Sequence, residues 1–387
     1  MRDIAIVSIA RTPVGRGLKG SLRDTRPDTL AGIVVKEALK RAPGVKPEEI
    51  GDVVLGCAMP EGEQGMNVAR TASFLAEIPD HVPAMTVNRF CSSGLQAIAI
   101  AASRISLGGI DCAIAGGVES MSMVPMGGNK PSAHPGLLEI RPETYMSMGI
   151  TAELVARKWD VTRKAQDEFA YGSHMKAIAA QKAGKFKNEI VPIQTRVFEE
   201  KGPRELTLSE DEGPRPDTTL EGLAKLRPVF DTQGTVTAGN SSQMSDGAGA
   251  AVLMTVEQAR AQGMQPIALF RHFVVVGVPP EVMGIGPVPA IRKLCQVAGI
   301  NIEDIGVFEI NEAFAAQSVY CVRELGIDPA RVNPNGGAIA LGHPLGATGA
   351  VLTAKILGEM KREGHRYGVV SMCVGGGMGA AGLFERA

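Results

Sequence analysis

An internal repeat is the feature that most constrains how this chain can fold. The segment PEEIGDVVLGCA, which starts at Pro47, resembles IEDIGVFEINEA, which starts at Ile302. CSSGLQAI at Cys91 likewise resembles GATGAVLT at Gly346. Both pairs are separated by roughly 255 residues, and a third pair, DCAIAGGVES and YGVVSMCVGG, agrees with that offset to within one residue. Three resemblances in one order predict a duplicated structural unit.

Each copy of the repeat has the pattern of an α/β unit. Runs such as DIAIVSIA, DVVLGCA and GVFEIN are short, rich in β-branched residues and bounded by glycine, which is typical of buried strands. Helical patterns such as PDTLAGIVVKEALKRA and GAVLTAKILGEMKREG lie between them. The alternation predicts an α/β fold in which helices cover a mostly parallel sheet.

The stretch between the copies breaks this pattern with methionine, proline and many charges, which predicts an inserted loop domain at residues 118–244. We therefore expect an N-terminal half at 1–117, to which 245–268 return, and a C-terminal half at 269–387. The methionines of the insertion either fill irregular gaps or form an apolar ligand wall, and the sequence leaves both interpretations open.

Composition excludes several classes of function. The formal net charge is −1, so no overall field attracts nucleic acid or an anionic membrane. No apolar run reaches the roughly 18 residues of a membrane span, and we expect a cytoplasmic protein without membrane insertion. The six cysteines form no CxxC pair, which argues against a zinc site or a disulfide framework.

Cys91 is the first candidate for chemistry. It lies in NRFCSSG, between the apolar run Ala84 to Val87 and a helical pattern that starts near Ser92. A turn from strand to helix places the thiol at the helix N-terminus, where the macrodipole favours the thiolate. A buried structural cysteine at such a turn is at least as common, so this signal alone does not decide the matter.

The second copy supplies two further candidates. His343 directly precedes the helix that matches the one after Cys91, so packing of the two copies would form a Cys–His pair, although a histidine before proline is more often a packing residue. Cys373 opens CVGGGMG after the strand pattern Tyr367 to Met372. This spacing is not GxGxxG and no ribose-binding acid follows, so a dinucleotide loop is rejected in favour of amides that face an oxyanion.

Taken together, NRFCSSG, NEAFA at Asn311, GGAIALGHPLGATGA and CVGGGMG resemble the active-site segments of the thiolase family. RTPVG at Arg11, AGGVESMS at Ala115 and TAGNSSQMSDGA at Thr237 extend the resemblance over essentially the whole chain. VVVGVPPEVMGIGP and LRPVF are most similar to the degradative 3-ketoacyl-CoA thiolases, the acetyl-CoA acyltransferases. The resemblance implies a five-layer fold of two repeated βαβαβαββ halves with an inserted loop domain over the coenzyme A pocket.

The resemblance also implies roles for individual residues. Cys91 would be the acylated nucleophile, His343 would take its proton and help to bind the substrate oxygen, and Cys373 would be the second acid/base. Asn311 would orient a water in one oxyanion hole, while the amides of Cys91 and Gly375 form the other. Two thiols and one histidine suffice for this chemistry, so no metal or other cofactor is expected, and coenzyme A is a substrate.

For coenzyme A and the acyl group, the resemblance points to Arg215, Ser242, Met148, Ala313 and Phe314. Each also has a plainer interpretation, since an exposed arginine usually solvates a surface and a phenylalanine usually packs in a core. Ser147 departs from the short-chain biosynthetic branch, which tends to have histidine before the Met-Gly pair. This departure argues against activity on acetoacetyl-CoA alone.

The predicted reaction is thiolytic cleavage of 3-ketoacyl-CoA by CoA in fatty acid β-oxidation. The alternatives are an acetoacetyl-CoA thiolase (acetyl-CoA acetyltransferase) and a non-catalytic acyl-CoA or lipid carrier; a decarboxylating condensing enzyme is disfavoured by Cys373. We expect a homodimer or homotetramer and leave open a β-oxidation multienzyme partner.

Overall fold

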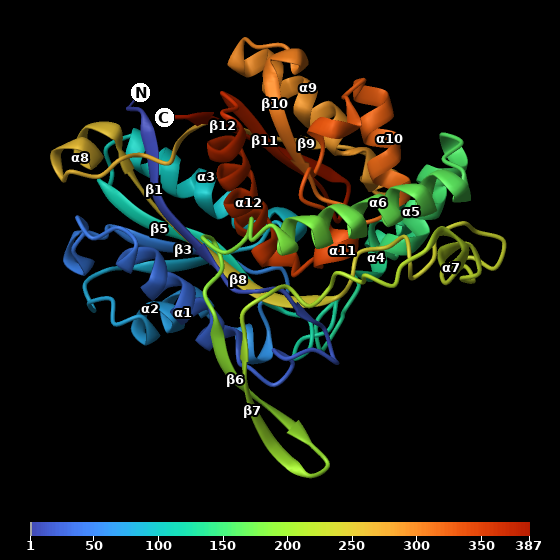
Figure 1. Ribbon diagram of the computed structural model, residues 1–387, viewed down its shortest axis with the longest axis horizontal. Coiled ribbons are helices and arrows are strands. Elements are labelled where there is room, and N and C mark those ends of the chain that lie inside the picture. Colours follow the sequence, from blue (N-terminus) through green and yellow to red (C-terminus); the bar gives the residue numbers. More distant parts are fainter. Residues whose placement is uncertain (1) are drawn as a thin grey trace.

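The structure, a computed structural model, describes residues 2–387 and shows the two copies as two parts of one ten-stranded sheet (Figure 1). The N-terminal part contains, in spatial order, β1 (Ile4–Arg11), β8 (Ser245–Thr255), β5 (Cys112–Ser120), β3 (Asp52–Gly56) and β4 (Ala84–Val87). The C-terminal part contains β9 (Ala268–Gly277), β12 (Met378–Arg386), β11 (Tyr367–Val374) and β10 (Ile305–Ile310). β1 pairs with β9 and joins the two parts, while the short β2 (Gly15–Arg16) pairs with β8.

The two parts have the same topology. β3 pairs in parallel with β5, as β10 does with β11. The pairs nearer the β1–β9 junction, β5–β8 and β8–β1, are antiparallel, as are β11–β12 and β12–β9. In the place of β4, the C-terminal part has a single parallel bridge between Phe308 and Val332. The predicted duplication of an α/β unit is confirmed.

The expectation of a mostly parallel sheet is wrong, because the sheet is mixed. Each copy ends with two successive strands that are not separated by a covering helix. In the C-terminal copy β11 and β12 are joined by the tight turn at 375–377, and a tight turn can connect only antiparallel neighbours. In the N-terminal copy β8 returns after the insertion to pair antiparallel with both β5 and β1.

Helices cover both parts and also separate them. The central helices α3 (Ser93–Ser106) and α12 (Thr348–Glu363) contact each other and strands of both parts (Figure 1). On the outer faces, α1 (Pro27–Lys40) and α2 (Val68–Leu75) cover the N-terminal strands, and α9 (Pro287–Ala298) and α10 (Ala315–Leu325) flank the C-terminal ones. The order helix, sheet, central helices, sheet, helix is the five-layer arrangement that the resemblance implied.

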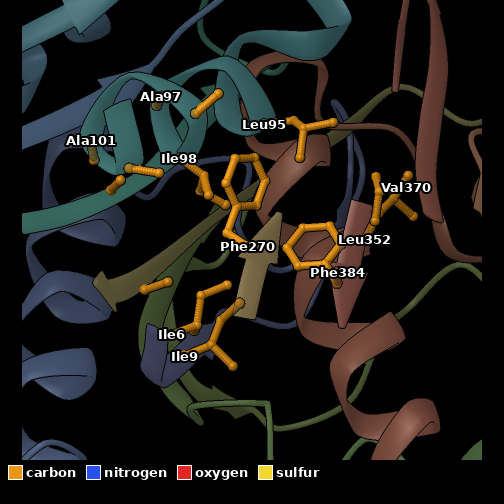
Figure 2. Close-up of a cluster of buried hydrophobic side chains, with 14 of the residues drawn as sticks. Ile6, Ile9, Leu95, Ala97, Ile98, Ala101, Phe270, Leu352, Val370 and Phe384 are labelled. Atoms are coloured by element: carbon orange, nitrogen blue, oxygen red, sulfur yellow. The ribbon is translucent and has the colours of Figure 1, made fainter. Parts of the chain in front are cut away.

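The central layer is held by apolar side chains from all sides. Leu95 and Ile98 of α3 and Leu352 of α12 are buried beside Phe270 and Phe384 (Figure 2). The two phenylalanine rings meet edge to face with centroids 5.3 Å apart. This cluster buries side chains from strands of both halves together with the two helices, so it ties the halves into one unit.

The two central helices start in backbone contact. A Cβ on Gly94 would lie 2.8 Å from the carbonyl oxygen of Gly346, and a Cβ on Gly349 would lie 2.1 Å from the amide nitrogen of Leu95. Gly94 and Gly349 are matching positions of the repeat. Because neither has a side chain, the turns that precede the two helices are brought together.

The inserted segment forms α4 (Pro135–Ile140), α5 (Met148–Lys158), α6 (Arg163–Lys182), α7 (Leu220–Ala224) and the hairpin of β6 (Ile193–Glu199) and β7 (Gly202–Leu208), which projects from the body (Figure 1). α5 packs on α10, α6 on α10 and α11 (Ala338–Leu341), and α8 (Val256–Ala261) follows β8. The exact boundaries at 117, 244 and 268 stay a prediction. No helix within residues 2–387 is both long and apolar enough to cross a membrane.

Candidate active site

Cys91 lies in a tight turn between β4 and α3. The turn Phe90–Ser92 is a short 3₁₀ segment, and Phe90 has φ of +43°, a conformation that a bulky side chain rarely adopts. Ser93 stabilises this turn, because its hydroxyl donates to the Phe90 carbonyl at 2.7 Å and accepts from the Arg89 amide at 2.9 Å. The turn therefore holds the Cys91 thiol in a defined place at the start of the helix.

The surroundings of Cys91 favour the neutral thiol. Burial raises its pKa to about 11, although the backbone N–H groups of Gly375 and of Cys91 itself act in the opposite direction. The sequence predicted that the helix start would favour the thiolate; burial outweighs that effect here. These two amides favour the thiolate, and they are the pair that was predicted to form an oxyanion hole.

His343 is held through both ring nitrogens. Its Nδ1 lies 2.6 Å from the Thr348 hydroxyl, and its Nε2 lies 3.3 Å from Nδ2 of Asn311. Its backbone N–H donates to the Gln243 carbonyl and to the Ser245 hydroxyl, both at 3.1 Å. These contacts fix the plane of the buried imidazole. Thr348 was not recognised from the sequence, because a threonine in the first turn of a helix is commonplace.

The imidazole is neutral at neutral pH. Burial lowers the pKa of His343 to about 4, so one ring nitrogen is unprotonated and can accept a proton. With the Asn311 amide oriented as above, its N–H donates to Nε2 and the ring proton lies on Nδ1, facing Thr348. Oδ1 of Asn311 is buried and accepts no hydrogen bond from the described part of the protein, so it can accept one from solvent or substrate.

Cys373 is the last residue but one of β11 and is fully buried. Burial, and then the proximity of Cys91, raise its pKa well above the ordinary value for a thiol. The turn that follows uses left-handed backbone at Gly376 and Gly377, with φ of +78° and +85°. A Cβ on Gly377 would lie 2.3 Å from the Val278 carbonyl oxygen, so this tight turn requires glycine there.

The fold brings these segments together at one corner of the molecule. The turn of Cys91 contacts both β11 and the turn Leu345–Ala347 that follows His343. Cys91, His343, Cys373, Asn311 and the amide of Gly375 thus gather from four separate segments. Within residues 2–387 no hydrogen bond links Cys91 directly to His343, and hydrogen bonds between catalytic groups often form only when substrate binds.

The residues predicted to contact coenzyme A lie on loops beside this corner. A Cβ on Gly375 would lie 3.8 Å from Sδ of Met148 and 3.7 Å from the Phe90 ring, so both side chains flank the glycine turn. The Ser242 amide donates to the Ala313 carbonyl at 2.9 Å, which places these two predicted residues side by side.

Phe314 and Phe230 extend this surface. Their rings meet edge to face with centroids 6.0 Å apart, and Phe230 also lies over Gly149, where a Cβ would approach the ring to 2.2 Å. Phe230 is 40% exposed although it is a large apolar side chain. It lies in LRPVF, a motif that was used only to recognise the family, so sequence reasoning missed it as a candidate site residue.

Arg215 lies at the exposed margin. Its amide donates to Nδ1 of the buried His174 at 3.1 Å. Its loop is tied to the site because the Gln243 side chain donates to the Gly213 carbonyl at 3.1 Å. The guanidinium has no ion-pair partner in the described part of the chain, so it remains available to an anionic ligand.

Metal chemistry has no evident ligand set. No group of three or more His, Cys, Asp and Glu side chains among residues 2–387 is arranged to hold a metal ion. The independence from metals and other cofactors stays a prediction.

A duplicated five-layer fold with two buried thiols and a neutral histidine at one corner defines the class of protein. The family model "Thiolase, N-terminal domain" matches residues 4–257, and "Thiolase, C-terminal domain" matches residues 264–386. The chain belongs to the thiolase family, as its motifs predicted.

Individual relatives cover the whole chain. The 3-ketoacyl-CoA thiolase of Bacillus subtilis (strain 168) is 57% identical over 390 residues, which are 100% of both chains. The peroxisomal 3-ketoacyl-CoA thiolase A of Mus musculus is 50% identical and aligns with 99% of this chain and 91% of its own length. The crystal structure of the Bacillus anthracis acetyl-CoA acetyltransferase superimposes with a TM-score of 0.91 at 41% identity, covering 100% of this chain and 99% of that one.

Proposed function

We propose that this protein is a 3-ketoacyl-CoA thiolase, which uses CoA to cleave 3-ketoacyl-CoA into acetyl-CoA and a shortened acyl-CoA in fatty acid β-oxidation. The observation that carries the proposal is the gathering of Cys91, Cys373 and a neutral His343 at one corner of the fold, with the Gly375 amide acting on Cys91. The names of the relatives at 57% and 50% identity support the same reaction.

In the first step, Nε2 of His343, the unprotonated ring nitrogen, takes the proton of the Cys91 thiol as the sulfur attacks the 3-keto carbon. The raised pKa of Cys91 and the lowered pKa of His343 make this transfer unfavourable by itself, so it is coupled to the new carbon–sulfur bond. The negative charge that develops on the keto oxygen is stabilised by the amides of Cys91 and Gly375.

In the second step, the bond between C2 and C3 breaks and its electrons pass to the departing acetyl-CoA enolate. Hydrogen-bond donors at His343 and Asn311 stabilise the enolate oxygen, and the Cys373 thiol donates its proton to C2. A high pKa keeps Cys373 protonated and ready for this role. The shortened acyl group remains as a thioester on Cys91.

In the third step, Cys373 takes the proton of an incoming CoA thiol, and the CoA sulfur attacks the acyl group. The Cys91 sulfur leaves and recovers the proton held by His343, so both thiols and the imidazole return to their starting states. Arg215, Ser242, Met148, Ala313 and Phe314 are proposed to hold CoA and the acyl chain, and we add Phe230 to this group. The half-exposed apolar side chains of Met148 and Phe230 support an apolar path toward Cys91.

Two alternatives remain distinguishable. An acetyl-CoA acetyltransferase is favoured by the name of the structural neighbour, which is 41% identical, whereas the relative at 57% identity favours the longer substrates. A non-catalytic acyl-CoA carrier would be expected to have lost Cys91, His343 or Cys373, and all three are present.

The edge of the sheet supports a homodimer. β4 is the last strand in the sheet order, and within residues 2–387 it pairs only with β3. Next to it, Met66 is 100% exposed, and Phe74 and Leu75 of α2 are half exposed. An unpaired edge beside exposed apolar side chains would suit pairing with a second copy, and sedimentation analysis distinguishes a dimer from a tetramer. The cytoplasmic location and a multienzyme partner stay predictions.

The deciding assay follows the loss of 3-ketoacyl-CoA after CoA is added, with a series of acyl chain lengths. We expect thiolysis of chains longer than acetoacetyl-CoA. Cleavage of acetoacetyl-CoA alone would support the acetyltransferase instead. Folded protein that cleaves no member of the series would contradict both enzymatic proposals and leave the carrier.

A further inference from the structure

Glu119 is a fully buried carboxylate at the end of β5 that the scheme above does not use. Its Oε2 accepts hydrogen bonds from the amides of Ala58 and Gly346, both at 2.8 Å. Its Oε1 accepts from the Met59 amide at 3.1 Å and from the Gln64 side chain at 2.5 Å. One carboxylate therefore joins the loop after β3 to the turn before α12.

The hydrogen-bond partners show that Glu119 is ionised. All four are N–H donors, and none offers a lone pair to the O–H of a protonated carboxyl group. Within residues 2–387 the remaining partner is the Cys57 thiol, which donates weakly to Oε1 with Sγ at 3.8 Å. Burial raises the pKa of Glu119, while the amides of Ala58, Gly346 and Met59 lower it. Within residues 2–387 no cation pairs with it, so amide dipoles alone balance its charge.

The Gly346 turn links Glu119 to the active site. Gly346 lies between His343 and Thr348, whose hydroxyl contacts the imidazole at 2.6 Å. The turn is also tightly enclosed, since a Cβ on Gly346 would lie 2.7 Å from Cα of Cys57. A shift of this turn would therefore move both His343 and the group that orients it.

We propose that Glu119 is a positioning residue for thiolysis: its carboxylate fastens the Gly346 turn to the N-terminal half, so that the imidazole of His343 stands opposite Cys91. The proposal rests on the function proposed above. It has a second measurable consequence, because the charge of Glu119 adds to burial in raising the pKa of the Cys91 thiol.

The test compares Glu119→Gln, Glu119→Asp and the control Glu153→Gln with the wild type. Glu153 is also a buried carboxylate that accepts backbone amides, from Thr235 and Val236, both at 2.8 Å, but it does not contact the Gly346 turn. For each protein, kcat and KM of thiolysis are measured. The rate of Cys91 alkylation by iodoacetamide is followed separately by peptide mass spectrometry at several pH values.

For Glu119→Gln we expect kcat to fall about 10- to 100-fold with little change in KM, as is usual for residues that orient a functional group. Cys91 should be alkylated faster at each pH, by about tenfold for each unit by which its pKa falls. The buried Cys112 and Cys321, whose thiols do not contact Glu119, should stay unmodified, whereas a loosened fold would expose them too. Glu119→Asp should keep the wild-type alkylation rate, because it keeps the charge, and should lose kcat through its shorter reach.

A folded Glu119→Gln protein with kcat within about threefold of wild type would overturn the proposal, as would equal effects in Glu153→Gln. If Glu119→Gln does not fold, Glu119→Asp decides: reduced kcat with wild-type alkylation supports the proposal, and unchanged kcat overturns it. Wild-type protein without thiolysis would instead contradict the proposed function, and the alkylation result does not depend on turnover.

Discussion

The duplicated fold creates two equivalent corners where a central helix of one half meets a strand end of the other. At the catalytic corner, Cys91 before α3 meets Cys373 and Gly375 after β11. At the second corner, which adjoins the first, Gly346 before α12 meets Gly117 and Glu119 of β5. The repeat aligns Cys91 with Gly346, Cys373 with Gly117 and Gly375 with Glu119.

The two corners use the same backbone for different purposes. At the catalytic corner the Gly375 amide acts on the Cys91 thiol, and the side chains there are the two buried thiols that we propose to react. At the second corner backbone fills the position of the corresponding side chain, since a Cβ on Gly117 would lie 2.1 Å from the Gly346 carbonyl oxygen.

The residue that the repeat aligns with His343 also differs in chemistry. His343 aligns with Asn88, whose side chain donates to the Ala58 carbonyl at 3.0 Å and accepts from the Phe90 amide at 2.8 Å. Asn88 therefore fixes loops, while His343 can move a proton. The comparison teaches that the duplicated fold supplies two converging helix starts, and that a few side chains make one of them a reactive site and the other an anchor.

The largest expected effect is the loss of the nucleophile. Cys91→Ala should lower kcat by about 10⁴-fold or more, because it removes the proposed acyl carrier and leaves Cys373 only its role in proton transfer. Intact-protein mass after brief exposure to 3-ketoacyl-CoA should show acylation of the wild type and none of the variant. Persistent acylation of the variant would show that another residue is the nucleophile, and the first corner would then not differ from the second by carrying it.

Acid should destabilise the protein through its buried histidines. The pKa of His343 and of His174 is lowered to about 4. The unfolded chain binds protons near pH 6.5, so stability is fully present above about pH 6.5 and is lost as pH falls toward about 4. Each histidine contributes at most about 3 kcal/mol to this loss.

Urea unfolding as a function of pH measures this dependence. His174→Gln should remove part of the slope between about pH 4 and pH 6.5 and leave the contribution of His343. An unchanged slope would show that His174 is not held neutral in the folded state.

Thr348 should matter for orientation of the base. Thr348→Val removes the hydroxyl that faces Nδ1 of His343 and should lower kcat/KM about 10- to 100-fold, while Thr348→Ser should stay near wild type. The aligned residue at the other turn is Ser93, which bonds only to backbone. Equal losses in Thr348→Val and Thr348→Ser would indicate that packing of the methyl group matters instead.

The smallest expected effect is on stability, and it depends on how much room each corner has for an added side chain. A Cβ on Gly375 would meet its neighbours at ordinary contact distances of 3.7 and 3.8 Å, whereas one on Gly346 would approach backbone at 2.7 Å. Gly346→Ala should therefore cost about 1–3 kcal/mol of unfolding free energy, and Gly375→Ala under about 1 kcal/mol. Chemical denaturation of both variants measures the two losses of unfolding free energy. Equal losses would contradict the tighter packing around Gly346.

Several elements could be predicted because they are local. The α/β pattern and the duplication are visible in short stretches of sequence. Cys91, His343 and Cys373 each lie in a contiguous motif, and these motifs identified the family. The expected thiolate at the start of α3 was wrong, and Thr348, Phe230 and Glu119 were not recognised as parts of the site. Their importance depends on what distant segments bring next to them.

The sequence by itself thus determined the repeated unit, the family and the segments of the residues that we propose to react, because periodicity and motifs are properties of neighbouring residues. The tertiary structure decided which side chains meet at each of the two equivalent corners and which protonation states their surroundings favour. Desolvation of Cys91 and His343 comes from segments of both halves, and Glu119 binds a turn of the other half. Burial and the convergence of N–H groups arise only when the halves pack, so charge states and anchoring contacts follow from packing.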